Sequence, residues 1–243
     1  MSNNSILTLD SIRDIKIYQS RDGYRFSVDA LLLFSFVNLQ RVKRIVDIGA
    51  GSGIIGILLA KKYSDAEVLL IEIQGTLASL SIKNIELNGL KERIKIINGD
   101  VRKVEDLGLI RGDYDLIVSN PPFRRINTGL VSNIDEKAIA RHEIKLSLND
   151  LMKASSYLLR HHGRLCIIYL PERLVEIIDV MRSYGLEPKR FQFVHSKALS
   201  EAKMVLIEAV KGGSVGLKVD RPFFIYNEDG SYTDEMKKIY EES

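Results

Sequence analysis

The chain reads Val46-Asp47-Ile48-Gly49-Ala50-Gly51-Ser52-Gly53-Ile54-Ile55-Gly56 where a short apolar run passes into a helical pattern. Glycines at such a junction permit positive φ angles and let a ligand approach the backbone closely. From Arg41 onward, short apolar runs alternate with longer helical patterns, which is typical of a parallel sheet covered by helices on both faces. The sequence therefore predicts an α/β fold with this turn at the end of its first sheet strand.

Seven strands are expected in this sheet, which should be mostly parallel. The connection between the last two strands is too short for a helical crossover, so they are expected to form an antiparallel pair at one edge. In chain order, the expected strands are Ile45–Asp47, Glu67–Glu72, Ile94–Asn98, Tyr114–Ser119, Arg164–Tyr169, Arg190–His195 and Lys203–Val210.

Helices are expected between the strands, and a further helical stretch from Ser27 to Leu39 precedes them. Glycine commonly follows the last residue of a helix. The helices are expected to begin near Gly53, Thr76, Ser147 and Pro171, with stops at Gly89, Gly163 and Gly185. No repeat or linker divides the pattern. Residues 1–243 are therefore predicted to form one domain, with an N-terminal extension (1–40), a substrate loop (124–145) and a C-terminal extension (211–243).

The composition limits the classes of protein to which the chain can belong. A chain of 243 residues with 45% hydrophobic residues can bury a sizeable core. Its start lacks the features of a secretion signal, and no apolar run is long enough to span a bilayer. Cys166 is the single cysteine and the four histidines are scattered, so no zinc-ligand spacing exists. We expect a cytoplasmic monomer without metal or membrane contact; its net charge of +3 permits a polyanionic partner.

A second informative stretch is Asn120-Pro121-Pro122-Phe123, which directly follows the apolar run ending at Ser119. Proline after asparagine forces the backbone out of the helical region, and the second proline keeps it extended. The amide oxygen of Asn120 and the neighbouring carbonyl groups then point in fixed directions, while Phe123 offers a flat face. Two acceptors and an aromatic surface suit a planar group that bears an NH2. A plain turn is the alternative interpretation, because Asn-Pro commonly opens one.

The glycine turn is compatible with two cofactors. Gly51, Gly53 and Gly56 have the spacing of a dinucleotide-binding turn, whereas Asp47, Gly49, Gly51 and Gly53 have the looser D-x-G-x-G-x-G spacing of S-adenosylmethionine enzymes. The glycines alone do not decide between them.

Acidic residues at two further strand ends favour S-adenosylmethionine. Glu72 lies 19 residues beyond Gly53, where a carboxylate accepts hydrogen bonds from ribose hydroxyls in either class of enzyme. Asp100 follows the third strand and could accept a proton from an adenine amino group, which a dinucleotide site does not require there. Each acid alone is equally compatible with a solvated strand end. Because the carboxyl ends of parallel strands meet at one edge of the sheet, Asp47, Glu72, Asp100 and Asn120 are expected to converge.

With these features the chain resembles the class I Rossmann-like methyltransferases, and within them the family of tRNA(Val) adenine-N6 methyltransferases. The resemblance covers nearly the whole chain. The glycine turn identifies only the superfamily, and the tetrad narrows it to enzymes that methylate a planar nitrogen. Four further segments resemble the family: Gly23-Tyr24-Arg25-Phe26-Ser27-Val28-Asp29, Asn84-Ile85-Glu86-Leu87-Asn88-Gly89-Leu90, Ala140-Arg141-His142-Glu143 and Ile225-Tyr226-Asn227-Glu228-Asp229-Gly230-Ser231-Tyr232-Thr233.

The resemblance implies a seven-stranded methyltransferase sheet, S-adenosylmethionine as cofactor and tRNA as substrate, with the adenine immediately 3′ of the valine anticodon as the modified base. The catalytic residues are then expected to be Asn120, Pro121, Pro122 and Phe123. The residues expected to bind the cofactor are Phe26, Ser27, Asp47, Gly49, Gly51, Gly53, Glu72, Ile73, Asp100, Val101 and Asn120. The residues expected to contact RNA are Phe123, Arg124, Arg125, Arg141 and His142.

Several other functions remain compatible with the sequence. Phenylalanine at position 123 is also frequent in rRNA guanine-N2 methyltransferases, although these often contain a duplicated domain that this chain lacks. Protein glutamine-N5 methyltransferases use the same tetrad, but they generally carry a sizeable helical domain for which residues 1–40 leave little room. An RNA-binding module with a vestigial pocket is the alternative without catalysis. It has no chemical need for Asp47, Glu72, Asp100 and Asn120 together.

Overall fold

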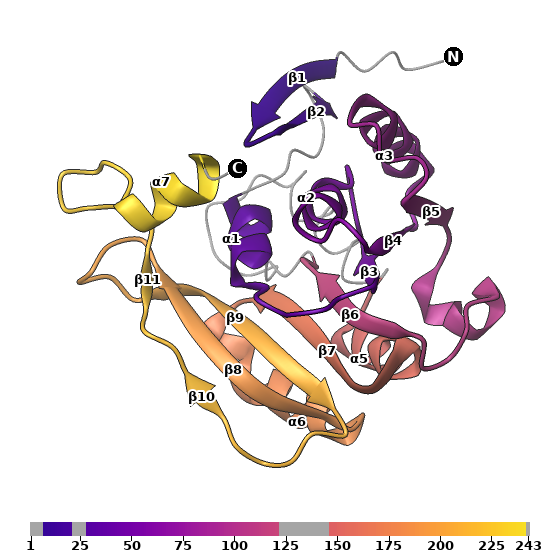
Figure 1. Cartoon of the computed structure of the whole chain (residues 1–243). Helices are drawn as coiled ribbons and strands as arrows, with labels where there is room; N and C mark the ends of the chain where they lie inside the picture. The colour runs from indigo at the N-terminus through magenta and orange to yellow at the C-terminus, as the bar shows by residue number, and fades with distance from the viewer. Residues whose placement is uncertain (1–6, 21–27, 122–145, 242–243) are drawn as a thin grey trace, which may run out of the picture.

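The structure is a computed structural model that describes residues 7–20, 28–121 and 146–241. Nine strands within these residues form one sheet in the order β10-β8-β9-β7-β6-β3-β4-β5, and β11 also pairs with β8 (Figure 1). The strands are β3 (Arg44–Ile48), β4 (Glu67–Glu72), β5 (Ile94–Asn98), β6 (Tyr114–Ser119), β7 (Leu159–Tyr169), β8 (Leu186–His195), β9 (Ala202–Lys211), β10 (Lys218–Val219) and β11 (Phe223–Phe224).

All seven expected strands are present, but the expected total of seven is wrong because β10 and β11 add two more to the sheet. Both are only two residues long and pair in parallel with β8. The expected antiparallel pair is confirmed: β9 runs antiparallel to β8 and also to β7. The pairs from β7 through β6, β3 and β4 to β5 are all parallel. The sheet is therefore largely parallel.

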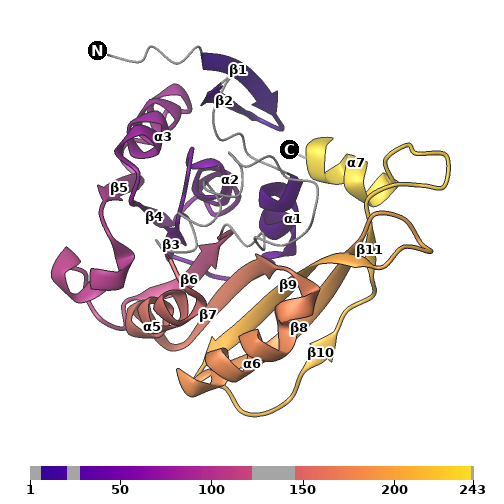
Figure 2. The same ribbon diagram turned by 180° about the vertical axis from the view of Figure 1, so that it is seen from behind.

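Helices cover both faces of the sheet. Helices α1, α2 and α3 lie on one face, while α5 and α6 lie on the other (Figures 1 and 2). The helices are α1 (Val28–Phe36), α2 (Ile54–Lys62), α3 (Gly75–Leu87), η1 (Val101–Leu107), α5 (Leu148–Leu158), η2 (Pro171–Arg173), α6 (Leu174–Ser183) and α7 (Asp234–Glu241). The expected helix starts are confirmed to within a few residues, and Ser147 caps α5 through a reciprocal bond with Asp150.

The expected helix stop at Gly163 is wrong. Helix α5 ends at Leu158, and the chain passes directly into β7, so Gly163 lies inside a strand. The pairing of β7 with β6 is irregular there, between Tyr114 and Leu116. A Cβ atom on Gly163 would lie 2.9 Å from the Arg160 carbonyl oxygen and 3.0 Å from the Tyr114 carbonyl oxygen. Glycine is therefore required by a close backbone approach rather than by a helix end.

The N-terminal extension contains a β-hairpin that the sequence did not predict. Strands β1 (Leu7–Ile12) and β2 (Ile15–Ser20) pair antiparallel and form a separate two-stranded sheet. Alternate residues of β2, Ile15, Ile17 and Gln19, are buried. The hairpin packs on the helical layer near α3 rather than extending the main sheet (Figure 1).

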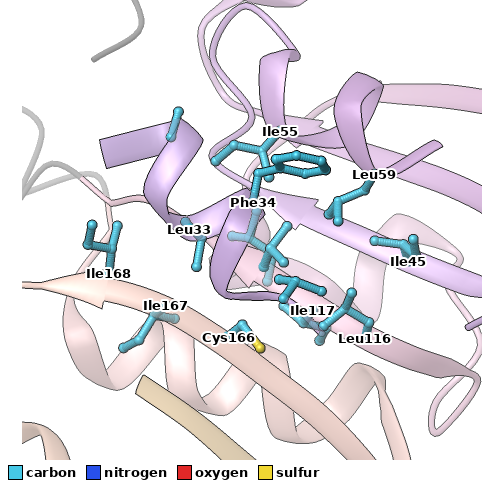
Figure 3. Packing of buried hydrophobic residues seen from close by; sticks show 14 of the residues in the cluster. Leu33, Phe34, Ile45, Ile55, Leu59, Leu116, Ile117, Cys166, Ile167 and Ile168 are labelled. Atoms are coloured by element: carbon cyan, nitrogen blue, oxygen red, sulfur yellow. The ribbon is translucent and has the colours of Figure 1, made fainter. Parts of the chain in front are cut away.

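The core is continuous from the strands into the first helical layer. Figure 3 shows Phe34 of α1 beside Ile55 and Leu59 of α2, with Ile117 and Cys166 on the strands below them. Burial raises the pKa of the Cys166 thiol strongly, so this cysteine is inert core packing. The apolar strands thus fix the sheet on which the polar strand ends are displayed.

Candidate functional site

The strand ends expected to form a site do converge. Strand β3 lies between β4 and β6, and all three are parallel, so their carboxyl ends meet at one edge. The register places Asp47 beside Val118 of β6 and Ile48 beside Ile71 of β4. The chain moves from β3 outward to β4 and β5 and then returns to β6 on the other side of β3. Such a switch in strand order opens a crevice where ligands bind in parallel sheets.

The glycine turn between β3 and α2 adopts a conformation that side chains disfavour. Gly49, Gly51 and Gly53 have φ angles of +72°, +59° and +84°. The backbone N–H groups of Gly49 and Ala50 both donate to the carbonyl oxygen of Ile71, at 2.9 and 3.2 Å. The turn is therefore tied to the end of β4, with its backbone close to the edge of the sheet.

Glu72 joins the glycine turn to the start of α3. Its Oε2 accepts a hydrogen bond from Gly51 N at 2.9 Å, and its Oε1 accepts one from Gln74 N at 2.8 Å. The residue is 4% exposed. Each carboxylate oxygen retains a second lone pair, so the group can still accept a hydrogen bond from a ligand hydroxyl. Ile73 follows it and is exposed, at 37%.

Asp47 is buried directly beneath the turn. Its Oδ2 accepts a hydrogen bond from Gly56 N at 3.1 Å, while Oδ1 has no partner among the described residues. Burial raises the pKa of this carboxyl from 3.8 to about 7; the Gly56 hydrogen bond opposes the rise, and nearby Glu72 adds to it. The free oxygen is a ready acceptor for a positively charged group.

Asp100, at the end of β5, is held by a cation of its own chain. Its Oδ1 accepts a hydrogen bond from the backbone N of Arg102 at 3.0 Å, and its Oδ2 pairs with the guanidinium at 2.7 Å. The Arg102 side chain is the main reason that the pKa of Asp100 is lowered. Val101 follows it, buried at the start of η1. Asp100 thus stays ionised, but a ligand amine would have to share it with Arg102.

The end of β6 is tied to β3. Ser119, fully buried, donates from Oγ to the carbonyl oxygen of Ile48 at 2.8 Å. The next two residues leave the strand: Asn120 is half-buried and Pro121 is buried. This places the Asn120 amide at the same edge as the glycine turn. The other expected site residues lie outside the described part of the chain: Phe26, Ser27, Pro122, Phe123, Arg124, Arg125, Arg141 and His142.

One face of α3 supports the site and was not predicted to do so. Ser81 Oγ donates to the Gly51 carbonyl at 2.7 Å, and Asn84 Nδ2 donates to the Ser52 carbonyl at 2.9 Å. Asn84 also holds strand β2, because its Oδ1 accepts from Tyr18 N at 2.7 Å and its Nδ2 donates to Tyr18 O at 3.1 Å. Asn88 binds Lys16 N and O in the same way, at 3.0 and 2.6 Å.

The two asparagines match the strand geometrically. Residues four apart on a helix are ~6 Å apart along its axis, close to the ~7 Å between alternate residues of a strand. Asn84 and Asn88 therefore pair with Tyr18 and Lys16 and cover the free edge of β2. The sequence signal was present in Asn84-Ile85-Glu86-Leu87-Asn88, but nothing local identified its partner.

Replacing Asn84 and Asn88 separately should distinguish support of the turn from support of the hairpin. Both hold β2, but only Asn84 also bonds to Ser52. Asn84→Ala is expected to weaken binding of S-adenosylhomocysteine about tenfold, as expected for a lost buried hydrogen bond of ~1–3 kcal/mol. Asn88→Ala is expected to leave it within twofold. Calorimetric titration well below both melting temperatures makes the comparison, and equal losses in the two variants would contradict it.

Neither a metal nor a membrane segment is indicated by the described residues. Within residues 7–20, 28–121 and 146–241, no three His, Cys, Asp or Glu side chains are grouped so that they could hold a metal ion. In the same part of the chain, no helix combines the length and the apolar character needed to cross a bilayer.

Solved structures share this fold. A predicted O-methyltransferase from Agrobacterium tumefaciens superimposes with a TM-score of 0.71 at 24% identity, covering 87% of this chain and 95% of that one. TYW2 from M. jannaschii, crystallised with AdoMet, superimposes with a TM-score of 0.58 at 16% identity, covering 86% and 88%. The Rossmann-like methyltransferase architecture expected from the sequence is therefore confirmed.

Sequence relatives carry one recurrent name, tRNA1(Val) (adenine(37)-N6)-methyltransferase. The protein from Trichodesmium erythraeum (strain IMS101) is 31% identical over 201 residues, 82% of each chain. That from Porphyromonas gingivalis (strain ATCC 33277) is 32% identical over 203 residues, 82% of this chain and 79% of that protein. That from Shewanella putrefaciens (strain CN-32) is 33% identical over a shorter stretch, 60% of each. The family model described as "Methyltransferase small domain" matches residues 25–172. The chain therefore belongs to the methyltransferase small-domain family, in agreement with the resemblance found in its sequence.

Proposed function

We propose that this enzyme transfers a methyl group from S-adenosylmethionine to the N6 amine of an adenine in tRNA, the base immediately 3′ of the anticodon in valine tRNA. The observation that carries the proposal is the position of Asn120 and Pro121 at the end of β6, beside the glycine turn. The names of the sequence relatives support the choice of adenine and of tRNA. S-adenosylmethionine supplies an electrophilic methyl group on a sulfonium.

The residues around the glycine turn suit this cofactor. Two buried polar atoms there, Asp47 Oδ1 and Ser52 Oγ, have no partner among the described residues. Glu72 accepts hydrogen bonds from the ribose hydroxyls, and Asp100 accepts one from the adenine amine. Asp47 faces the ammonium group, directly or through water. The bare glycines let the cofactor lie against the backbone.

Asn120 and Pro121 activate the substrate amine. The exocyclic amine of adenine is a poor nucleophile because its lone pair is delocalised into the ring. The Asn120 side-chain oxygen and the Pro121 carbonyl accept its two N–H bonds, which draws the nitrogen toward a tetrahedral geometry. The positive charge that develops on nitrogen meets the same fixed dipoles. A strong general base is not required, because the proton leaves only after the amine has become cationic.

The remaining site residues complete the proposal, although they lie outside the described residues. Phe123 stacks on the target base, which contributes ~1–3 kcal/mol and offsets the cost of unstacking it. Arg124, Arg125, Arg141 and His142 contact the RNA, and Phe26 and Ser27 line the methionine end of the cofactor.

The raised pKa of Asp47 predicts a pH-dependent stability. The carboxyl is neutral in both states below pH 3.8; above that the unfolded chain ionises first, so the stability due to this group is lost as pH rises toward about 7. The loss is roughly 4 kcal/mol in total, at 1.36 kcal/mol per pKa unit. The difference in unfolding free energy between the protein and its Asp47→Asn variant, measured from pH 4 to 8 without cofactor, should fall by this order. A difference independent of pH would contradict the prediction.

One assay tests the proposed function. Labelled S-adenosylmethionine is incubated with the enzyme and either total tRNA, ribosomal RNA or a protein extract, and the labelled nucleoside is identified after digestion. N6-methyladenosine in valine tRNA is expected. Label in N2-methylguanosine or in glutamine would show one of the other acceptors that the tetrad permits. No transfer to RNA or protein would reject the proposal.

A further inference from the structure

A second cavity lies away from the strand ends just described. It measures about 750 Å³ and lies between the tip of the β1–β2 hairpin, the ends of α1 and α2, strand β8 and the C-terminal segment. In both views α7 lies next to α1 on this side of the sheet (Figures 1 and 2). Three acidic residues line it, against six basic ones: Arg13, Lys61, Lys62, Arg190, Arg221 and Lys238. We call this cavity the basic groove.

Most of these cations have a carboxylate partner. Lys61 lies 3.5 Å from Asp14, and Arg221 pairs with Glu235. Arg190 lies 3.0 Å from Glu208, which is outside the lining, and 3.4 Å from Asp220. The local carboxylates are therefore largely committed to these three cations.

Arg13 and Lys62 differ from the others. Arg13 donates to the Ile239 carbonyl at 3.1 Å, and Lys62 donates to the Val37 carbonyl. Within the described residues, neither cation has a carboxylate within ion-pair distance. A carbonyl oxygen satisfies one N–H group but does not neutralise the charge. Two positive charges in the groove are thus left without compensation.

These two cations share one aromatic ring. The Arg13 guanidinium lies 5.2 Å from the centre of the Phe34 ring, and Lys62 Nζ lies 5.3 Å from the same centre. Arg190 lies 3.9 Å over the neighbouring Phe36 ring. The rings hold the cations in place, so their charges are preorganised. Burial lowers the pKa of Lys62, and the charges of Arg13 and Arg190 lower it further.

We propose that the basic groove binds phosphate groups of the RNA substrate through Arg13 and Lys62. A phosphate offers several anionic oxygens to cations that converge from different elements, and it relieves their mutual repulsion. The rings of Phe34 and Phe36 are already covered by cations, so the groove takes the backbone rather than a base. This inference rests on the proposed function only in naming RNA as the ligand.

The position of the groove suits one RNA molecule that also reaches the strand ends. Lys62 is the last residue of α2, and the glycine turn precedes its first residue, Ile54. The two ends of this helix are separated by ~12 Å, at 1.5 Å per residue. An RNA stem and loop extends well beyond this length, so the target base and the groove can be engaged together.

The test compares two neutralising variants with a charge-matched control. Arg13→Gln and Lys62→Met, singly and together, remove the uncompensated charges, while Lys153→Met removes an exposed cation on α5, on the other face of the sheet. Affinity for valine tRNA is measured by filter binding at several salt concentrations. The double variant is expected to bind about tenfold more weakly and to lose about two phosphates' worth of salt dependence. Lys153→Met is expected to change neither quantity.

Stability separates binding from structure. Because Lys62 is a desolvated cation near two others, Lys62→Met is expected to melt no lower than the unaltered protein while binding RNA more weakly. S-adenosylhomocysteine affinity should stay unchanged, which verifies folding at the strand ends. Unchanged tRNA affinity and salt dependence in the double variant would overturn the proposal. So would saturable binding of inorganic phosphate or a mononucleotide that depends on Arg13 and Lys62 while tRNA affinity does not.

The outcome is independent of the methylation assay. If the unaltered enzyme fails to methylate tRNA, the proposed function fails, and the RNA-binding comparison still judges the groove. If it methylates tRNA and the double variant binds tRNA as tightly as before, only the groove is rejected.

Discussion

Replacement of Asn120 by alanine is expected to lower kcat by about 10²–10³-fold and to leave the affinity for S-adenosylmethionine within a few-fold. Losing one preorganised acceptor commonly costs ~3 kcal/mol of transition-state stabilisation. The effect should fall on kcat because the acceptor matters most as the amine nitrogen becomes cationic. The ground state loses only one of several contacts. Single-turnover methylation at saturating tRNA, with cofactor affinity measured by calorimetry, gives the two quantities separately.

Two further substitutions at Asn120 sharpen the test. Asn120→Asp keeps an acceptor oxygen of the same reach and should retain more activity than the alanine variant. Asn120→Gln moves the amide by one methylene and should be nearly as inactive as alanine, because a shift of about 1 Å in a positioned group costs on the order of 10²-fold. Full activity in Asn120→Ala would remove this residue from the mechanism. A large loss of cofactor affinity with unchanged kcat would assign it to cofactor binding instead.

Replacement of Glu72 by glutamine is expected to weaken cofactor binding about 10–100-fold and to destabilise the fold. Both carboxylate oxygens accept from backbone N–H groups, Gly51 N at 2.9 Å and Gln74 N at 2.8 Å. A glutamine amide must turn its NH2 group toward one of these donors, which leaves a buried N–H unsatisfied at ~1–3 kcal/mol. It also loses the charge that strengthens hydrogen bonds from ribose hydroxyls. The two losses should appear in calorimetric titration and in chemical denaturation, respectively.

Glu67 is the matched control, because it begins the same strand that Glu72 ends. Its side chain is exposed and lies at the opposite edge of the sheet. Glu67→Gln makes the same chemical change and should alter cofactor affinity less than twofold. If the two variants weaken binding equally, a general charge effect rather than the strand-end position of Glu72 is responsible.

Local patterns predicted the larger elements well, and non-local pairing explains the failures. The seven longer strands have apolar runs that mark them in any context. Strands β10 and β11 are two residues long and exist only because they pair with β8, so no periodicity marks them. Gly163 follows a helical pattern as a helix stop would, but its contact with the Tyr114 carbonyl made it a strand residue. Both misses depend on residues distant in the chain.

The sequence by itself determined the α/β class, the glycine turn and the order of polar residues at four strand ends, because each depends on neighbours within one element. Tertiary structure alone decided what those residues touch. Only the folded chain brings Glu72 to Gly51, Asn84 to Tyr18 and Ser52, and Arg13 to Phe34 near Lys62. Side-chain hydrogen bonds and charge clusters join separate elements, and periodicity along one element carries no record of the partner.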